Sequence, residues 1–234
     1  MPTGMWTNDH HLRGIGRQIE VLSQKMGDIG YVITPQTPLI EAIRKMDKLG
    51  GRILLSEGTW LFYGRLDVPR SIELVSLSPG RTIFKRHASC DAASLRLTGT
   101  ECVIDGVRFL DAAGVVRHTV EVTGARCFIK NCTFESVAAG VSLSGSSDYS
   151  AVQNNLFVAA TADHFITGSG VDYLQITGNR FITHAAGKSS VFLDNTVEKS
   201  LVVGNVADSS AGNYRYKTGL GTVVEHNIGT VTAV

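Results

Sequence analysis

Short alternating runs of apolar and polar residues fill the C-terminal two-thirds of the chain and return at a nearly constant interval. Each run ends in a small polar pair, a pattern that predicts a short strand with one buried face followed by a tight turn. The pairs are Thr98-Gly99, Thr123-Gly124, Ser144-Gly145, Thr167-Gly168, Asp194-Asn195 and Thr218-Gly219. They recur every 21 to 27 residues, which leaves room for two or three strands per repeat and none for a helix.

A second set of positions keeps the same interval. Phenylalanine returns at Phe109, Phe134, Phe157 and Phe181. Asparagine returns at Asn155, Asn179, Asn205 and Asn227. A period of about 24 residues, carried by two residue types at once, is the signature of a solenoid.

The predicted fold is all-β, a right-handed parallel β-helix of about seven coils. Each repeat is one coil, and each strand pairs with its copies in the coils before and after it. An antiparallel β-sandwich also has many short, evenly spaced strands. The sandwich does not predict that Phe, Asn and Thr-Gly return in register, whereas identical side chains stack into ladders in parallel sheets.

Residues 37–51 are predicted to form a helix that caps the open end of this solenoid. Thr37 is a suitable N-cap, Pro38 suits the first helical position, and Gly50-Gly51 ends the helix. One apolar face follows helical spacing and consists of Leu39, Ala42, Ile43 and Met46. A cap is needed because the first coil otherwise exposes unpaired strands and core.

The segment Thr37-Pro38-Leu39-Ile40-Glu41-Ala42-Ile43, followed by Gly50-Gly51-Arg52-Ile53-Leu54-Leu55-Ser56-Glu57-Gly58-Thr59-Trp60, resembles the entry segment of the pectate-lyase-like β-helix superfamily. In that superfamily a helix precedes a Gly-Gly, an apolar strand and a Glu-Gly-Thr-aromatic turn. Phage tailspikes and many glycan lyases and hydrolases share it. The resemblance covers about residues 36–230 and implies the fold, whereas activity must be argued from sites.

Residues 1–35 are predicted to be a separate helical or coiled-coil assembly segment, ahead of a domain at 36–234. Its apolar positions, followed at the end by Ile29, step by three and four and are Leu12, Ile15, Ile19, Leu22 and Met26. This heptad predicts the interface of a homotrimer, because trunks already held side by side supply a high effective concentration. The alternative is an amphipathic helix folded back on its own trunk.

Composition narrows the setting of the protein. The 234 residues are 43% hydrophobic with a net charge of +1, which argues against a nucleic-acid partner. No apolar run reaches the length of a membrane span and the start lacks signal-peptide features, so we expect a soluble chain without membrane partners. The four cysteines lack metal-site spacing; we expect reduced core residues, no bound metal and no cofactor.

A glycoside hydrolase site would need outward-facing carboxylates in neighbouring coils, because hydrolysis needs an acid and a base or nucleophile. Glu121 is expected beside Arg96, and Asp105 beside Lys130, so neither outer column offers a carboxylate pair. The remaining candidates are Asp163, His164, Asp194 and Glu198. The competing interpretation is turn capping and solvated charge.

One outer column is predicted to carry the aromatic residues Phe165, Phe192 and Tyr216. Stacked aromatic rings on an outer face either bind sugar rings or are covered by a neighbouring subunit. The pattern favours the subunit interface of a trimer over a glycan platform, because the flanking segments carry no other marked feature.

These observations together predict a phage virion structural protein, either a tail spike or fibre or a capsid decoration, that is assembled in the host cytoplasm. Its expected partners are two further copies of itself, other virion proteins and host surface polysaccharide. The alternative is a polysaccharide lyase or glycoside hydrolase with a site in a groove or between subunits. It predicts product release and loss of activity on changing Asp163 or Glu198.

Overall fold

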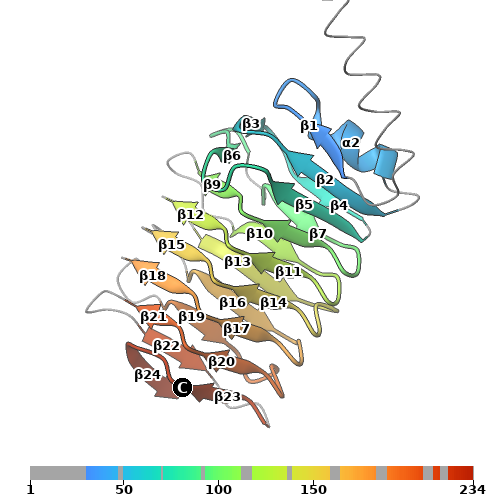
Figure 1. Cartoon of the computed structure of the whole chain (residues 1–234). Coiled ribbons are helices and arrows are strands. Elements are labelled where there is room, and N and C mark those ends of the chain that lie inside the picture. Colours follow the sequence, from blue (N-terminus) through green and yellow to red (C-terminus); the bar gives the residue numbers. More distant parts are fainter. Residues whose placement is uncertain are drawn as a thin grey trace, which may run out of the picture.

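The computed structural model describes residues 30–46, 50–69, 71–90, 93–111, 118–135, 139–158, 164–182, 189–207, 213–216 and 221–233. These residues form a right-handed parallel β-helix in which coils stack from the N-terminal to the C-terminal end (Figure 1). The fold class predicted from the repeat is confirmed. The described coils come close to the predicted number of about seven.

Each coil contributes one strand to each of three parallel sheets, here named A, B and C in chain order. Sheet A contains β1 (Tyr31–Ile33), β2 (Gly51–Leu55), β5 (Ile72–Ser76), β8 (Val103–Asp105), β11 (Phe128–Lys130), β14 (Ala151–Gln153), β17 (Gln175–Thr177), β20 (Leu201–Val203) and β23 (Val223–Glu225). Sheet B contains β3 (Gly58–Phe62), β6 (Thr82–Arg86), β9 (Arg108–Leu110), β12 (Thr133–Glu135), β15 (Leu156–Val158), β18 (Arg180–Ile182) and β21 (Val206–Ala207). Sheet C contains β4 (Leu66–Val68), β7 (Leu95–Leu97), β10 (His118–Val122), β13 (Ala139–Ser144), β16 (Ile166–Ser169), β19 (Val191–Leu193), β22 (Asn213–Tyr216) and β24 (Thr230–Ala233).

The predicted phenylalanine ladder runs through the core beneath sheet B. Neighbouring rings of Phe109, Phe134, Phe157 and Phe181 stack with centroids 4.8, 4.6 and 5.1 Å apart. All four are buried, and Phe84 extends the ladder with an edge-to-face contact to Phe109 at 5.7 Å. Such contacts add stability beyond area burial, about 0.5–1.5 kcal/mol per pair. The ladder therefore ties each coil to the next.

The predicted capping helix is present as α2 (Leu39–Met46) at the N-terminal end of the stack (Figure 1). It buries Leu39, Ala42 and Ile43, the face predicted from helical spacing. Gly50 ends it: its N–H donates to the carbonyl of Met46 at 2.8 Å, and its φ is +67°. The helix packs against β1 and β2, so the first strand of sheet A lies at 31–33, ahead of residue 36, where the β-helix domain was predicted to start.

One of the predicted turn pairs is wrong. Thr167 and Gly168 lie within β16, where Gly168 pairs with Leu143 and Leu193. The corresponding turn begins instead at Ser169, which pairs with Ser144, and Gly170 takes the left-handed backbone (φ +64°) that Gly145 takes one coil earlier (φ +68°). The small Gly168 fits inside because a Cβ there meets Leu193 Cδ2 at 2.8 Å.

A buried ion pair joins two coils between sheets B and C. Arg86 Nε donates to Asp111 Oδ1 at 2.9 Å, its Nη2 contacts the second carboxylate oxygen, and both side chains are fully buried. Thr119 Oγ1 donates to the same carboxylate, and Arg86 Nη1 donates to the His118 carbonyl. Every charge is thus hydrogen-bonded, as burial demands. No helix in the described ranges is long and apolar enough to cross a membrane.

Candidate functional site

Most turns from sheet C to sheet A hold a left-handed residue two positions before the next strand of sheet A, and in the last coil this residue is Gly221. The non-glycine residues at this position are Glu101, Arg126, Tyr149, Tyr173 and Lys199, with φ between 50° and 61°. Four of them donate their N–H to a carbonyl of the neighbouring coil, as when Tyr149 donates to the Asp172 carbonyl at 3.1 Å. We call this column the aromatic corner. Left-handed geometry costs a bulky L-residue roughly 1–2 kcal/mol, so large side chains here are unusual.

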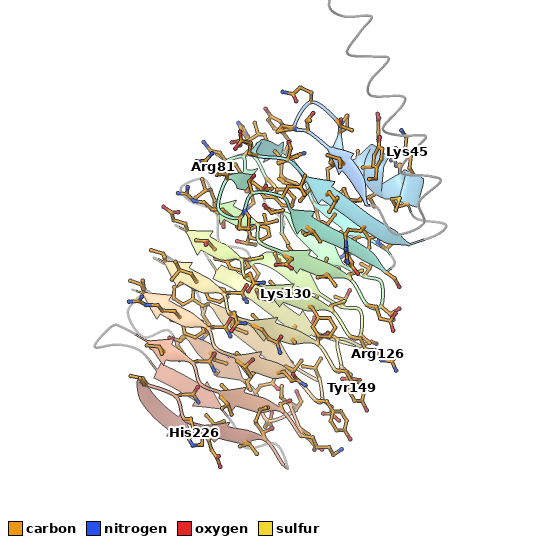
Figure 2. All side chains as sticks on the ribbon, in the orientation of Figure 1. Lys45, Arg81, Arg126, Lys130, Tyr149 and His226 are labelled. Carbon is orange, nitrogen blue, oxygen red and sulfur yellow. The ribbon has the colours of Figure 1, made fainter. Side chains whose placement is uncertain are left out.

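Two tyrosines form the centre of the aromatic corner. The rings of Tyr149 and Tyr173 stack with centroids 4.5 Å apart and planes 4° from parallel. Tyr149 is 54% exposed and Tyr173 is 38% exposed, so the pair faces solvent. Figure 2 shows Arg126 and Tyr149 at one edge of the stack, in successive coils. The corner therefore offers an ordered, solvent-facing aromatic surface.

Charged side chains flank the tyrosine pair at both ends. On one side Arg126 Nη1 lies 3.5 Å from Glu101 Oε1. On the other, Lys199 Nζ lies 5.3 Å from the centroid of the Tyr173 ring, within the range of a cation–π contact. The Tyr173 hydroxyl, and then Asp172, raise the pKa of Lys199 above its ordinary value, so this side chain stays charged.

A row of carboxylates lies directly beside the aromatic corner. Asp148, Asp172 and Glu198 each precede a corner residue in the sequence. Asp148 Oδ1 accepts the N–H of Asp172 at 2.8 Å, and Asp172 Oδ1 accepts the N–H of Glu198 at 3.2 Å. Lys199 Nζ lies 3.9 Å from Asp172 and 3.8 Å from Glu198. The sequence did not reveal this common face, and the structure assembles it.

The turns from sheet A to sheet B share the left-handed geometry but have a different composition. Their left-handed residues include Gly80, Gly106, Asn131, Asn154, Gly178, Gly204 and His226. We call this column the asparagine corner. Next to it runs a buried ladder in which Asn155, Asn179 and Asn205 each donate a side-chain N–H to the next asparagine, Asn227 being the last, at 2.9–3.0 Å. The predicted asparagine ladder is confirmed as an internal support.

Among the described residues, the predicted catalytic side chains His164, Asp194 and Glu198 contact different groups. Asp163 lies outside the described residues. His164 Nδ1 accepts the N–H of Ser189 at 2.6 Å, and its ring stacks on Phe192 with centroids 4.8 Å apart. Asp194 Oδ1 accepts the N–H of Thr196 at 2.9 Å and caps its own turn. Glu198 belongs instead to the row of carboxylates beside the aromatic corner, where a parallel β-bridge joins its backbone to that of Asp172 in the preceding coil.

The predicted outward aromatic column is wrong for Phe165. Its side chain is fully buried and packs against Phe157 and Phe181, with centroids 5.3 and 5.7 Å apart. The register places Thr167 in this row, beside Phe192, because the coil is offset by two residues from the predicted alignment. Phe192 is half-buried against His164, and the backbone of Tyr216 pairs with Leu193.

Two predicted ion pairs and the predicted trimer interface remain to be compared with the structure. Lys130 Nζ lies 3.3 Å from Asp105, which confirms that pair, whereas Arg96 lies beside Glu121 in register but bonds to Asp67 at 2.7 Å. The heptad residues Leu12, Ile15, Ile19, Leu22 and Met26 lie outside the described residues, so the trimer interface stays a prediction.

Sequence reasoning missed the tyrosine pair, although a signal was present. Asp148-Tyr149 and Asp172-Tyr173 repeat an Asp-Tyr dipeptide at a step of 24 residues, the period of the phenylalanine ladder. Glu198-Lys199 continues the column in acidic-then-large form. The turns therefore repeat with the same period as the strands, and this period predicts that Tyr149 and Tyr173 lie in neighbouring coils.

The structure is therefore that of a parallel β-helix protein whose aromatic corner presents ordered side chains to solvent. Residues 83–228 match the family model described as periplasmic copper-binding protein (NosD). The match spans 146 of 234 residues, and the chain belongs to this family. No curated protein matches the chain.

Solved structures support the fold. A PL6 alginate lyase in complex with a trisaccharide is similar with a TM-score of 0.62 at 14% identity, over 86% of this chain and 54% of that chain. The Dettilon tailspike protein is similar with a TM-score of 0.52 at 12% identity, over 84% of this chain and 54% of that chain. This chain therefore spans about half the length of either protein, and the likeness establishes architecture alone.

The family description raises the question of copper. Among the described residues, no group of three or more His, Cys, Asp or Glu side chains could hold a metal ion. The buried thiols of Cys102 and Cys127 share the Gly99 carbonyl as acceptor, at 3.6 and 3.2 Å. The hydrogen bond with Cys102, together with burial, raises the pKa of the Cys127 thiol. Burial raises the pKa of Cys132 to about 12. Copper binds thiolates, so the raised pKa values of Cys127 and Cys132 disfavour copper at these two thiols, whereas the hydrogen bond with Cys127 lowers the pKa of Cys102.

Proposed function

We propose that this protein is a polysaccharide-binding β-helix protein and that the aromatic corner is its binding surface. The observation that carries the proposal is the stacked, exposed pair Tyr149 and Tyr173 in left-handed backbone geometry. Strained geometry persists where the surrounding structure holds it, and it concentrates at functional sites. The neighbouring turns of sheets A and B meet the same backbone demand with Gly, Asn and a single His.

The chemistry of the corner suits a hydroxyl-rich ligand. Tyrosine hydroxyls donate and accept hydrogen bonds, carboxylates accept them, and the side chains of Arg126 and Lys199 donate. The ladder repeats at the spacing of parallel strands, about 4.8 Å, so a chain lying along the stack meets a similar set of groups coil after coil. Tyrosine also supplies contact area at low conformational cost because it has few rotatable bonds.

Affinity electrophoresis of the full chain through gels containing a panel of polysaccharides tests this proposal. We expect retardation by at least one polysaccharide, lost in Tyr149→Ala/Tyr173→Ala. His226→Ala is the matched control, because His226 is also exposed and left-handed (φ +53°) but lies on the asparagine corner. If Tyr149→Ala/Tyr173→Ala is retarded as strongly as the parent, the aromatic corner is not the binding site.

We further propose that the binding surface belongs to a homotrimeric virion component, a tail spike, tail fibre or capsid decoration that binds host surface polysaccharide. The likeness to the Dettilon tailspike fold supports this setting, as does the apolar heptad at Leu12 to Met26. Light scattering of the full chain should give three times the mass of one chain. Ile15→Asp/Ile19→Asp should lower it to the mass of one chain, and a monomeric parent would contradict the proposal.

Cleavage of polysaccharide is the second candidate, and one contact favours it. A parallel β-bridge sets the backbones of Asp172 and Glu198 one coil apart, about 4.8 Å, and their carboxylates lie 3.9 and 3.8 Å from the same Lys199 Nζ. Retaining hydrolases use carboxyl groups roughly 5–5.5 Å apart. Release of reducing ends from a retained polysaccharide, abolished in Glu198→Gln while most of the retardation remains, would establish cleavage, because glutamine keeps one acceptor oxygen for a sugar hydroxyl. Retardation without new reducing ends would establish binding alone.

A further inference from the structure

The charges at the aromatic corner are already satisfied within the protein. Arg126 is paired with Glu101, and Lys199 lies between Asp172 and Glu198. A ligand carboxylate or sulfate would have to compete with these acids for both cations. The corner therefore lacks the uncommitted basic groups that binding of an acidic glycan requires.

The sum of the charges points the same way. The corner and the carboxylate row beside it contain four acids, Glu101, Asp148, Asp172 and Glu198, against the two cations Arg126 and Lys199. The formal total is −2. Backbone N–H groups bind one oxygen of Asp148 and one of Asp172, which holds these carboxylates in place with acceptor capacity to spare. A polyanion lying along the stack would meet this excess negative charge coil after coil.

We infer that the ligand is a neutral, hydroxyl-rich polysaccharide, bound along the stack by Tyr149, Tyr173 and the carboxylates of Asp148, Asp172 and Glu198. This inference rests on the proposed function and narrows it. Sugar hydroxyls donate to the carboxylates and exchange hydrogen bonds with the phenols, and they need no charge from the protein. Tyrosine edges and hydroxyls contact the ligand, while Lys199 covers one face of Tyr173. The alginate lyase of similar fold, in contrast, is named for an acidic polysaccharide.

The experiment compares two classes of ligand on the full chain by affinity electrophoresis. Dextran, galactomannan and a β-glucan are the neutral probes, and alginate and polygalacturonate are the acidic ones. Each is run at low salt and at about 0.15 M, where surface charges more than about 8 Å apart are largely screened. We expect at least one neutral probe to be retained at least tenfold more strongly than either acidic probe, at both salt concentrations.

Three variants connect the result to the corner. Tyr149→Ala/Tyr173→Ala should lose neutral retention at least tenfold, and His226→Ala should keep it. Glu198→Gln removes one negative charge with little change in shape, so it should raise the retention of acidic probes at low salt. A thermal melt of each variant separates loss of binding from loss of folding.

The outcomes separate the inference from the proposed function. Tyrosine-dependent retention that is stronger for an acidic probe would overturn the neutral class and leave polysaccharide binding intact. Retention that is the same in Tyr149→Ala/Tyr173→Ala as in the parent, or no retention by any probe, would overturn the proposed function and this inference with it. Neutral retention that depends on both tyrosines supports both.

Discussion

The aromatic corner and the asparagine corner are two edges of one solenoid with the same backbone geometry and different side chains. Both place residues of successive coils at φ between about 50° and 80°. The asparagine corner fills it with Gly, Asn and one His, the usual solution to left-handed geometry. The aromatic corner fills it with Glu, Arg, Tyr, Tyr and Lys, and with Gly221 only in the last coil. The difference teaches that one edge meets the backbone demand with residues that suit it, while the other, where the proposed binding surface lies, meets it with larger side chains at a backbone cost.

The inner layers of the two corners differ as well. Behind the asparagine corner lies the buried ladder of Asn155, Asn179 and Asn205, which bonds to backbone groups of neighbouring coils. Behind the aromatic corner lie small residues, such as Ser150, whose Oγ accepts the N–H of Cys127 at 3.0 Å, and Ser200. The asparagine ladder therefore contributes more hydrogen bonds per coil, and we expect stability to depend on one corner and binding on the other.

The largest effect is expected from Asn179→Ala in the buried ladder. The change removes hydrogen bonds to the Asn155 N–H and side chain, to the Val152 carbonyl and to Asn205. Each buried group left unsatisfied costs about 1–3 kcal/mol, so the free energy of unfolding should fall by at least about 3 kcal/mol. Urea unfolding followed by circular dichroism measures it. Asn154→Gly, exposed and left-handed, is the control and should change stability by less than about 0.5 kcal/mol; a similar loss in both variants would contradict the difference between layers.

The second effect is the reverse case, a loss of binding with little loss of stability. Tyr149→Ala/Tyr173→Ala removes the stacked pair, worth about 0.5–1.5 kcal/mol to the fold. Affinity for the retained polysaccharide should fall at least tenfold, about 1.4 kcal/mol. Titration calorimetry with that polysaccharide measures the affinity, and the same change at His226 serves as the control. A loss of affinity matched by unfolding at the assay temperature would count against a direct role.

A third prediction exchanges the residues of the two corners. Arg126→Asn relieves a bulky left-handed residue at the loss of an exposed ion pair with Glu101, and exposed pairs contribute little. It should raise the free energy of unfolding by about 0.5–1 kcal/mol. Asn131→Arg at φ +54° should lower it by about 1 kcal/mol, because it adds strain and removes the bond to Asp105. Unfolding curves that shift in the same direction for both would show that the corners do not differ in backbone strain.

The smallest expected effect concerns pH. The Tyr173 hydroxyl and then Asp172 raise the pKa of Lys199 above its ordinary value of 10.5, so the folded state holds this proton more tightly than the unfolded state. The resulting stabilisation is present below pH 10.5 and is lost as the pH rises through the folded-state pKa. Melting temperatures at pH 9 to 12 should fall slightly less in Lys199→Gln than in the parent. Lys85→Gln controls for the loss of one surface charge, and identical slopes for Lys199→Gln and the parent would contradict the coupling.

The repeat made the fold predictable in detail. Phe109 to Phe181 and Asn155 to Asn227 were placed in ladders from spacing alone, and they stack as expected. The cap was predictable for the same reason, because Gly50 and the apolar face from Leu39 are local signals. Parallel pairing in register turns a sequence period directly into contacts in space.

The functional edge was much less predictable. Phe165 was expected outside and lies in the core, because an error of register in one coil reassigns its side chains. Arg86 and Asp111 stand 25 residues apart, the same step as Phe84 and Phe109, yet their buried ion pair was not predicted. Asp172 and Glu198 were read as acids in separate turns, yet the stack makes them neighbours.

The sequence by itself determined the architecture of this protein, a capped parallel β-helix with internal ladders, because a period of about 24 residues admits one coil per repeat. Only the tertiary structure decided which edge carries the candidate site. Turns vary in length from coil to coil, so the position of a turn residue depends on the register that the strands adopt. Backbone geometry then decides the rest: left-handed φ at Tyr149 and Tyr173 turns both rings outward into a stacked pair, a property that no residue type reveals on its own.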